Sequence, residues 1–338
     1  MRPFPWHFAE LERLLQDRTR LPHALLVHGR QGIGKAEFAR GLAASLLCES
    51  PQGALACGAC ESCHWFSQGN HPDFREVIPE AAEEDAQGDA EAAPKADAKK
   101  SLAIKIDQIR AQADFIALTT HRAGFRVLVI RPAEALHPAA ANALLKTLEE
   151  PPPATVIVLV SGEPSRLLAT IRSRCRTLAL PMPAAEAALA WLAAEGVAQP
   201  RVALAVAGGA PLLARELAQP EEAQLRQRVI AELSRPSGSD PLAFAERIDR
   251  TALERTIYWM QTWVHDLLRI RSGAAVRHHT DFAPAAQAKA RAADPEALFD
   301  LERELRAARA LASHPLNARL VAEHLLMSYN RATSGARK

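Results

Sequence analysis

A glycine-rich segment that ends in a lysine, residues 29–36, fits the phosphate-binding P-loop pattern G-x-x-x-x-G-K. In such a loop backbone N–H groups wrap the phosphates of a nucleotide, the lysine reaches the terminal phosphates, and a following Ser or Thr holds Mg²⁺. Gly29, Gly32, Gly34 and Lys35 are present, but Ala36 stands where the hydroxyl is needed. The pattern predicts a degenerate P-loop in which nucleotide binding is weakened and left open; a glycine-rich turn that only packs a helix on a strand is the alternative.

The second element of a P-loop ATPase is an apolar strand that ends in acidic residues, which bind the metal and polarise the attacking water. Here the apolar run 127–130 is followed by Arg131, a cation where the first carboxylate belongs. Glu134 comes three residues later and would have to reach back. Because Ala36 and Arg131 affect the same Mg²⁺ site, we expect no hydrolysis there, whether or not Lys35 still holds a nucleotide.

Four of the five cysteines lie close together, in the order Cys48-x8-Cys57-x2-Cys60-x2-Cys63. Four thiolates are the ligand set of a closed tetrahedral zinc site, which leaves no position open for chemistry. We therefore predict a structural zinc ion. Four reduced thiols, or an iron–sulfur cluster, are the alternatives. We interpret His64 and His71 as bystanders and assign Cys175 to a different motif.

Composition narrows the class of protein. The chain has 338 residues, with 41 Lys and Arg against 39 Asp and Glu, so a strong electrostatic attraction to nucleic acid over the whole surface is not implied. No apolar run approaches the roughly 18 residues of a membrane span, and residues 1–6 lack a signal-peptide pattern. We expect a cytoplasmic protein without membrane contact, whose cysteines serve metal or stay reduced.

The elements that position these motifs follow from hydrophobic patterning. Strand-like apolar runs occupy residues 21–27, 126–130 and 155–160, and helical patterns occupy residues 37–47, 104–118 and 139–150, the last opened by Pro138. Alternating strands and helices predict an α/β domain with a parallel sheet. After Pro181 and Pro183 no strand-like run stands out, and residues 243–270 and 295–312 have helical period. The fold class is therefore α/β plus all-α, with residues 79–100 as a flexible surface loop because they lack aromatic and β-branched residues.

Two further motifs make a family resemblance specific. Residues 141–152 read Ala-Asn-Ala-Leu-Leu-Lys-Thr-Leu-Glu-Glu-Pro-Pro, and a short predicted helix over 165–171 is followed by Ser173-Arg174-Cys175. Together with the P-loop and the four-cysteine insert, this order resembles the bacterial clamp-loader branch of the AAA+ proteins over roughly residues 20–180. The lost magnesium ligands resemble a non-hydrolysing subunit of that branch rather than its tau/gamma ATPase subunit.

The resemblance implies three domains. Residues 1–180 would form the AAA+ α/β domain with its zinc-binding insert at 48–63, residues 181–220 a small helical lid, and residues 221–338 a helical collar that assembles the subunits. It also implies a place in the clamp loader of a replicative DNA polymerase III holoenzyme, without an ATPase of its own. The implied partners are tau/gamma ATPase subunits, a delta subunit, the sliding clamp and primer–template DNA.

The resemblance assigns a role to Arg174, with Ser173 beside it in the motif. In the family this arginine projects into the ATP site of the neighbouring subunit, where a planar guanidinium stabilises charge on the γ-phosphate as an arginine finger. A helix cap or a local ion pair is the alternative for Arg174. Ser161 is at the sensor-1 position, and no arginine aligns with sensor 2 near residues 208–211, because Arg215 comes later.

The helix over 139–150 presents two faces. Asn142, Lys146 and Glu149 share one face, which serves an interface or is simply solvated. A buried stripe is predicted for Leu144, Leu145 and Leu148. Two other functions remain open at this point: an active tau/gamma-like ATPase, and a zinc-ribbon nucleic-acid-binding module with a vestigial P-loop. The nearly neutral net charge argues against the second.

Overall fold

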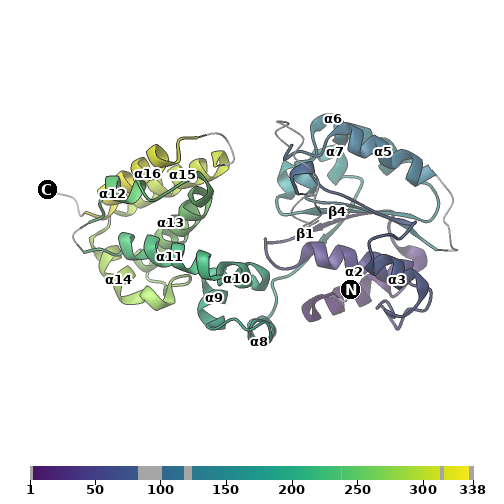
Figure 1. The fold of residues 1–338 in the computed structure, drawn as a ribbon, viewed down its shortest axis with the longest axis horizontal. Helices are drawn as coiled ribbons and strands as arrows, with labels where there is room; N and C mark the ends of the chain where they lie inside the picture. Colours follow the sequence, from purple (N-terminus) through teal and green to yellow (C-terminus); the bar gives the residue numbers. More distant parts are fainter. Residues whose placement is uncertain (1–2, 83–100, 118–123, 237, 313–315, 335–338) are drawn as a thin grey trace, which may run out of the picture. The chain divides into compact units, whose positions relative to one another are not determined.

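The computed structural model describes residues 3–82, 101–117, 124–236, 238–312 and 316–334. The chain divides into two compact units, Met1–Ala184 and Ala185–Lys338 (Figure 1). Buried hydrophobic residues occur in both units. Most of the segment expected to be a flexible loop, residues 83–100, lies outside the described residues. Among the described residues no helix combines the length and the apolar character that crossing a membrane requires.

The first unit is built on a sheet of five parallel strands in the order β2-β3-β4-β1-β5. The strands are β1 (Ala24–His28), β2 (Phe74–Val77), β3 (Arg126–Ile130), β4 (Thr155–Ser161) and β5 (Arg176–Ala179). The three central strands β3, β4 and β1 are the apolar runs that the sequence predicts, and the parallel α/β fold is confirmed. The two edge strands were not predicted, because each is short and carries charged or polar residues.

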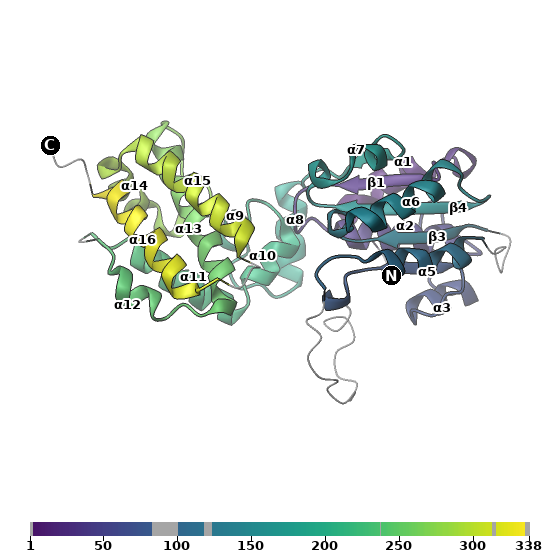
Figure 2. The same ribbon diagram turned by 90° about the horizontal axis from the view of Figure 1, so that it is seen from above.

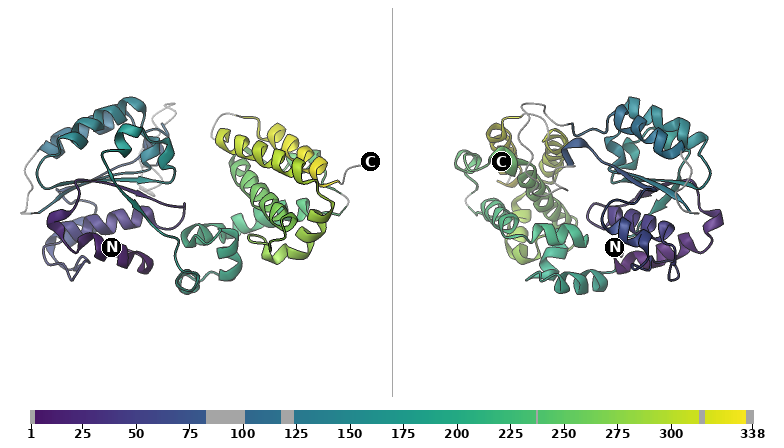
Figure 3. Two further views of the ribbon diagram at one scale, coloured as in Figure 1. Left: turned by 180° about the vertical axis from the view of Figure 1, so that it is seen from behind. Right: turned by 45° about the vertical axis from the view of Figure 1, so that its right-hand side comes forward.

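Helices cover both faces of this sheet. On one face lie α2 (Lys35–Leu47) and α3 (Glu61–Ser67), and on the other lie α5 (Ile106–Ala117), α6 (Pro138–Glu149) and α7 (Ala169–Arg172), as Figure 1 and the left view of Figure 3 show. Successive side chains of a strand point to opposite faces. Leu26, Leu128 and Ile157 accordingly join the core under α5, α6 and α7. Helix α2 contacts β1, β3 and β4 from the other side.

Two local predictions in this unit were only partly right. The helix expected over 165–171 is broken into a 3₁₀ turn, η4 (Pro164–Arg166), and α7. The break occurs because Leu167 and Leu168 adopt extended backbone, which buries Leu167 in the core. In α6, Pro138 is the first residue as predicted, but Leu145 is only partly buried.

The second unit is helical throughout its described residues, as predicted. Its α-helices are α8 (Ala185–Ala194), α9 (Pro200–Val206), α10 (Pro211–Leu217), α11 (Pro220–Leu233), α12 (Pro241–Ala245), α13 (Arg250–Arg271), α14 (Ala283–Ala292), α15 (Pro295–Leu311) and α16 (Ala318–Thr333). Helix α13 contacts α11, α14, α15 and α16, and α15 lies beside α16 (Figure 2). Helices α8, α9 and α10 contact one another. A lid that ends near residue 220 stays a prediction.

The helical period noted over residues 243–270 covers two helices, the end of α12 and most of α13. Asp249 caps the start of α13, where its carboxylate accepts a hydrogen bond from the N–H of Ala252 at 2.8 Å. Such a cap satisfies an N–H that would otherwise lack a partner, and so favours a new helix start at this point. Farther along α13, the buried carboxylate of Asp266 accepts hydrogen bonds from the backbone N–H groups of Arg277, His278 and His279.

Candidate functional site

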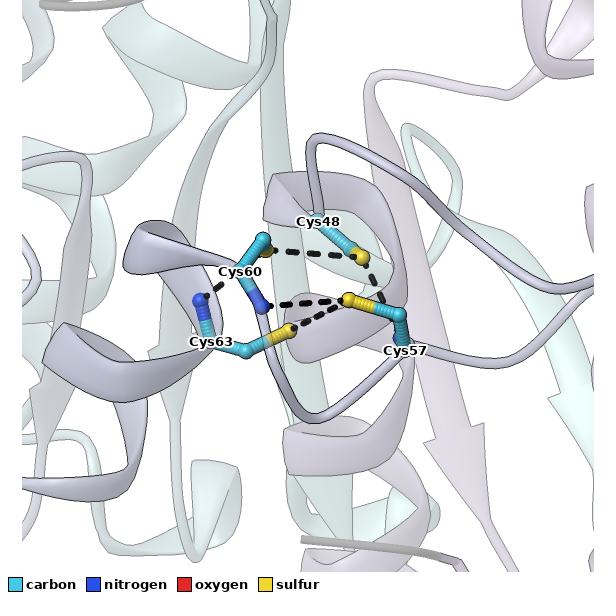
Figure 4. A group of neighbouring side chains, drawn as sticks. All are labelled: Cys48, Cys57, Cys60 and Cys63. Carbon is cyan, nitrogen blue, oxygen red and sulfur yellow. Dashed lines mark hydrogen bonds between the residues drawn. The ribbon is translucent and has the colours of Figure 1, made fainter.

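The four clustered cysteines come from the end of α2, a loop and the start of α3 (Figure 4). Their Sγ atoms all lie within 4.8 Å of one another, and the pairs Cys48–Cys60 and Cys57–Cys63 are each 3.9 Å apart. Four sulfurs around one tetrahedral zinc ion, each about 2.3 Å from the metal, lie about 3.8 Å apart. The four side chains therefore converge with the spacing of a metal site.

The surroundings of the cluster favour thiolate at one cysteine and oppose it at another. Cys57 Sγ accepts hydrogen bonds from the backbone N–H groups of Ala59 and Cys60, which lower the pKa of this thiol to about 6. Burial raises the pKa of Cys63 to about 12. The two nearby histidines are engaged elsewhere. His71 Nε2 lies 2.8 Å from Ser62 Oγ, and His64 Nε2 lies 3.1 Å from Gln68 Nε2. Among the described residues, cysteines alone converge here as candidate ligands.

The P-loop connects β1 to α2 and is held by its own chain. Gly34 caps α2 with φ +92°, a conformation that favours glycine. Lys35 is the first residue of α2, and its Nζ donates a hydrogen bond to the carbonyl of Arg30 in the same loop at 2.9 Å. Burial lowers the pKa of Lys35, and Glu134 and then Glu37 work in the opposite direction. The lysine thus already has partners in this state.

An aromatic segment ahead of β1 lies against the P-loop. Trp6 Nε1 donates a hydrogen bond to the carbonyl of Ile33 at 3.0 Å, and the rings of Phe4 and Trp6 stack at 4.7 Å. A Cβ added at Gly34 would lie 2.6 Å from Phe4 Cδ2 and 3.0 Å from His7 Cε1. His7 is fully buried, which lowers its pKa to about 4 and keeps it neutral at physiological pH. The loop and this segment are in van der Waals contact, so they form one structural unit.

Arg131, the cation in place of the first carboxylate, shares a single carboxylate with a second arginine. Its Nε lies 2.6 Å from Glu76 Oε1, and Arg40 of α2 approaches the same carboxylate, with Nη2 at 2.5 Å from Oε2. Burial works to raise the pKa of Glu76, but the hydrogen bonds from Arg40 and Arg131 outweigh burial and lower it. Sequence analysis missed Glu76 and Arg40, because neither belongs to a motif and Glu76 lies in an unpredicted edge strand.

Glu134, at the carboxyl edge of the sheet, is held by a backbone hydrogen bond. Its Oε1 accepts a hydrogen bond from the backbone N–H of Gly162, directly after β4, at 2.9 Å. Ser161, at the expected sensor-1 position, is fully buried, and its Oγ accepts a hydrogen bond from the N–H of Glu163. Glu134 is thus held by the end of β4. Arg215, near the expected sensor-2 position, pairs with Glu195 at 2.8 Å within the second unit.

The Ser-Arg-Cys motif follows α7, with Ser173 and Arg174 exposed and Cys175 buried. Cys175 is buried in the core of the first unit. Ser173 Oγ donates a hydrogen bond to the carbonyl of Thr170, and Arg174 Nη1 donates to the same carbonyl at 3.0 Å. Arg174 Nη2 also lies 2.5 Å from Oε1 of Glu149, the last residue of α6. Arg174 therefore has a local ion pair and an exposed guanidinium at once.

Register places Arg174 and the P-loop at opposite edges of the sheet. Arg176 of β5 pairs with Leu25 near the start of β1, so Arg174 lies at the amino edge. The P-loop follows His28, at the carboxyl edge. Five residues of β1 separate the two edges, and at about 3.3 Å per residue they lie roughly 15 Å or more apart. Arg174 cannot reach a phosphate in the P-loop of its own chain.

Comparison with known proteins identifies relatives of both units. The family described as "DNA polymerase III, delta subunit" matches residues 7–184, and "DNA polymerase III, delta subunit, C terminal" matches residues 220–330. A protein of Pseudomonas aeruginosa described as "DNA polymerase III subunit delta'" is 38% identical, over 79% of this chain and 77% of that protein. Its namesake from Escherichia coli is 33% identical, over 81% of this chain and 79% of that protein.

A relative with another description matches a smaller part. The protein of Salmonella typhimurium described as "DNA polymerase III subunit tau" is 34% identical, but over 46% of this chain and 21% of its own length. The two delta' relatives above match most of the present chain, whereas this tau relative matches less than half of it.

Proposed function

We propose, from the premise that this chain belongs to the family of DNA polymerase III delta' subunits, that it is a clamp-loader subunit which does not hydrolyse ATP itself. It would act by supplying Arg174 to ATP held by a neighbouring subunit. The observation that carries this proposal is the separation of Arg174 from the P-loop of its own chain by the length of β1. A phosphate contact of Arg174 has to be made with another molecule.

The carboxyl edge of the sheet supports the absence of hydrolysis. Ala36 supplies no hydroxyl for Mg²⁺. At the same edge the guanidinium groups of Arg131 and Arg40 both pair with the carboxylate of Glu76. Cations at this edge disfavour a divalent metal, because like charges repel at short range. Lys35 bonds to its own loop, and Phe4 and Trp6 lie against that loop. These features support the proposal that the site does not turn over ATP, whether or not it binds a nucleotide weakly.

The proposed metal is a structural zinc ion held by Cys48, Cys57, Cys60 and Cys63. It would join the end of α2 to the start of α3 and leave no position for a substrate. Metal analysis of the purified protein should give about one zinc per chain. Cys57→Ser should lower that content, whereas Cys175→Ser, which alters the cysteine outside the cluster, should retain it. A full zinc content in Cys57→Ser would contradict the assignment.

The proposed partners follow from the family. They are tau/gamma-type ATPase subunits and a delta subunit, with the sliding clamp and primer–template DNA as the objects on which the complex acts in the cytoplasm. We propose that α8–α10 form the lid and that the helices after residue 220 form the collar. Contacts within α8–α10 and around the central helix α13 support this division.

The test is reconstitution of the complex with its ATPase subunits. Removal of an arginine finger costs roughly 10³–10⁵ in rate in systems with one site. Since other sites of a clamp loader continue to work, we expect Arg174→Ala to lower the stimulated ATPase rate about two- to tenfold while assembly is retained. Arg174→Lys should not restore the rate, because lysine lacks the planar fork.

The matched control is Arg172→Ala, which removes an exposed arginine two residues away. It should leave the stimulated ATPase rate close to that of the unaltered complex. An unchanged rate in Arg174→Ala, in a complex that assembles normally, would refute the proposed role of Arg174.

A further inference from the structure

The guanidinium of Arg174 is held by two acceptors of different kinds. Glu149 Oε1 carries a full negative charge and lies 2.5 Å from Nη2, whereas the Thr170 carbonyl is neutral and accepts from Nη1 at 3.0 Å. Any anion that approaches the guanidinium has to compete with the carboxylate. The neutral carbonyl opposes an anion far less, so the two contacts have different consequences for phosphate binding.

The two contacts also differ in what they depend on. Thr170 lies in α7, one turn before Arg174, and Ser173 Oγ donates a hydrogen bond to the same carbonyl. This contact lies within one turn of chain, so it is kept as long as the end of α7 is folded. Glu149 lies at the end of α6, a different helix that contacts α7. Loss of the charge on Glu149 would therefore leave Arg174 oriented by its own turn.

Exposure makes the ion pair readily exchangeable. The side chains of Arg174 and Glu149 are 36% and 49% exposed, so water screens their attraction. Pairs of this kind shift an equilibrium by only about two- to fivefold. A triphosphate offers several negative oxygens in a geometry that suits the guanidinium fork better than one carboxylate oxygen does. Arg174 can therefore leave Glu149 for a phosphate at a small cost in affinity.

We propose that Glu149 is a positioning residue that holds Arg174 at rest and releases it to the γ-phosphate of the neighbouring subunit's ATP. The inference rests on the proposed finger role of Arg174. While the pair is formed, the guanidinium is unavailable, and the apparent affinity for ATP falls by the fraction of chains in which it is free. Glu149 thereby sets the ATP concentration at which the neighbouring site responds.

The experiment uses Glu149→Gln in the reconstituted complex, with the steady-state ATPase rate measured against ATP concentration. Gln keeps the size of the side chain and a carbonyl acceptor but removes the charge. We expect the KM for ATP to fall about two- to fivefold, while kcat changes by less than twofold. Glu150→Gln, at the adjacent exposed carboxylate, should leave both constants unchanged. A KM in Glu149→Gln that equals or exceeds that of the unaltered complex overturns the proposal.

A second arm separates this inference from the function on which it rests. In an Arg174→Ala background, Glu149→Gln should have no further effect on KM, because its partner is absent. A shift that persists there overturns the proposal, since Glu149 would then act through another group. If Arg174→Ala alone leaves the ATPase rate unchanged, the proposed function fails. If that variant lowers the rate while Glu149→Gln leaves KM unchanged, only the inference about Glu149 fails.

Discussion

At the carboxyl edge of the sheet the charged groups have hydrogen-bond or ion-pair partners within the chain, whereas at the amino edge Arg174 combines an ion pair with an exposed side chain. Lys35 bonds to Arg30, Arg131 pairs with Glu76, and Glu134 accepts from Gly162. Arg174 at the amino edge has an exposed partner that can be exchanged. A charged residue in a motif can act on a ligand only where its own fold leaves it available. Arg174, whose ion-pair partner is exposed, meets this condition better than Lys35, which bonds to its own loop.

The largest loss of stability is expected at the carboxyl edge, where the P-loop contacts the aromatic segment around Phe4. Gly34→Ala brings a Cβ to 2.6 Å from Phe4 at a residue with φ +92°. Steric overlap and left-handed backbone together should lower the free energy of unfolding by about 2–4 kcal/mol. Denaturant unfolding measures this loss.

Gly53→Ala is the matched control for that prediction. Gly53 has φ +63° and no atom within 4 Å of an added Cβ, so only backbone strain of about 1 kcal/mol applies. Equal losses in the two variants would mean that the aromatic segment does not press on the P-loop. The contrast between the P-loop at the carboxyl edge and the exposed Arg174 at the amino edge would then be weaker.

The next largest loss of stability is expected when the carboxylate that pairs with Arg131 is removed. Glu76→Gln leaves two half-buried guanidinium groups without a carboxylate and should cost about 1–3 kcal/mol at pH 7. Because the folded pKa of Glu76 lies below its ordinary value of 4.5, its contribution is complete above pH 4.5. The contribution is lost as the pH falls through the folded pKa. The difference in stability between the two proteins should therefore narrow below pH 4.5.

Glu163→Gln provides the control for the pairing. Glu163 and Arg166 form an exposed pair at 3.8 Å, so the loss at pH 7 should be close to zero. Urea unfolding at pH 7 and at pH 4 tests both variants. A cost in Glu76→Gln no larger than that in Glu163→Gln would show that Arg131 is not held by this pair.

The smallest effect is expected at the residue that defines the P-loop motif. Lys35→Ala should leave the ATPase rate of the reconstituted complex within about twofold, because Lys35 bonds to its own loop and no turnover is expected in this site. The same assay on the isolated chain should detect no hydrolysis that depends on Mg²⁺. A tenfold loss in Lys35→Ala, comparable with that in Arg174→Ala, would remove the contrast between the two edges.

The success of the fold prediction varied with burial. Strands β1, β3 and β4 are covered by helices on both faces, so their sequences are continuous apolar runs that stand out. Strands β2 and β5 lie at the edges and include Arg75, Glu76 and Arg176. An edge strand has one partner strand and tolerates charge, so its pattern does not differ from that of a loop. For a related reason the break between α12 and α13 was missed, since helical period continues across it.

For the candidate site, the cysteine cluster was predicted from the sequence, but the partners of the charged residues were not. The four cysteines were predicted as one cluster because their spacing along the chain already limits where they can lie, and the structure brings their sulfurs together. The partners of the charged residues were not predicted. Glu149 precedes Arg174 by 25 positions, and Glu76 precedes Arg131 by 55. No periodicity relates residues at such separations.

The side chains named in the sequence already establish which groups the P-loop segment lacks and which motif carries an arginine. Ala36 and Arg131 lack magnesium ligands in any fold, because those properties belong to the side chains themselves. Packing in three dimensions sets where each charged side chain finds its partner and which of them stays exposed. It does so through the order and register of the strands, which put the P-loop and Arg174 at opposite ends of β1. Pairing across a sheet depends on long-range packing, and local sequence does not encode it.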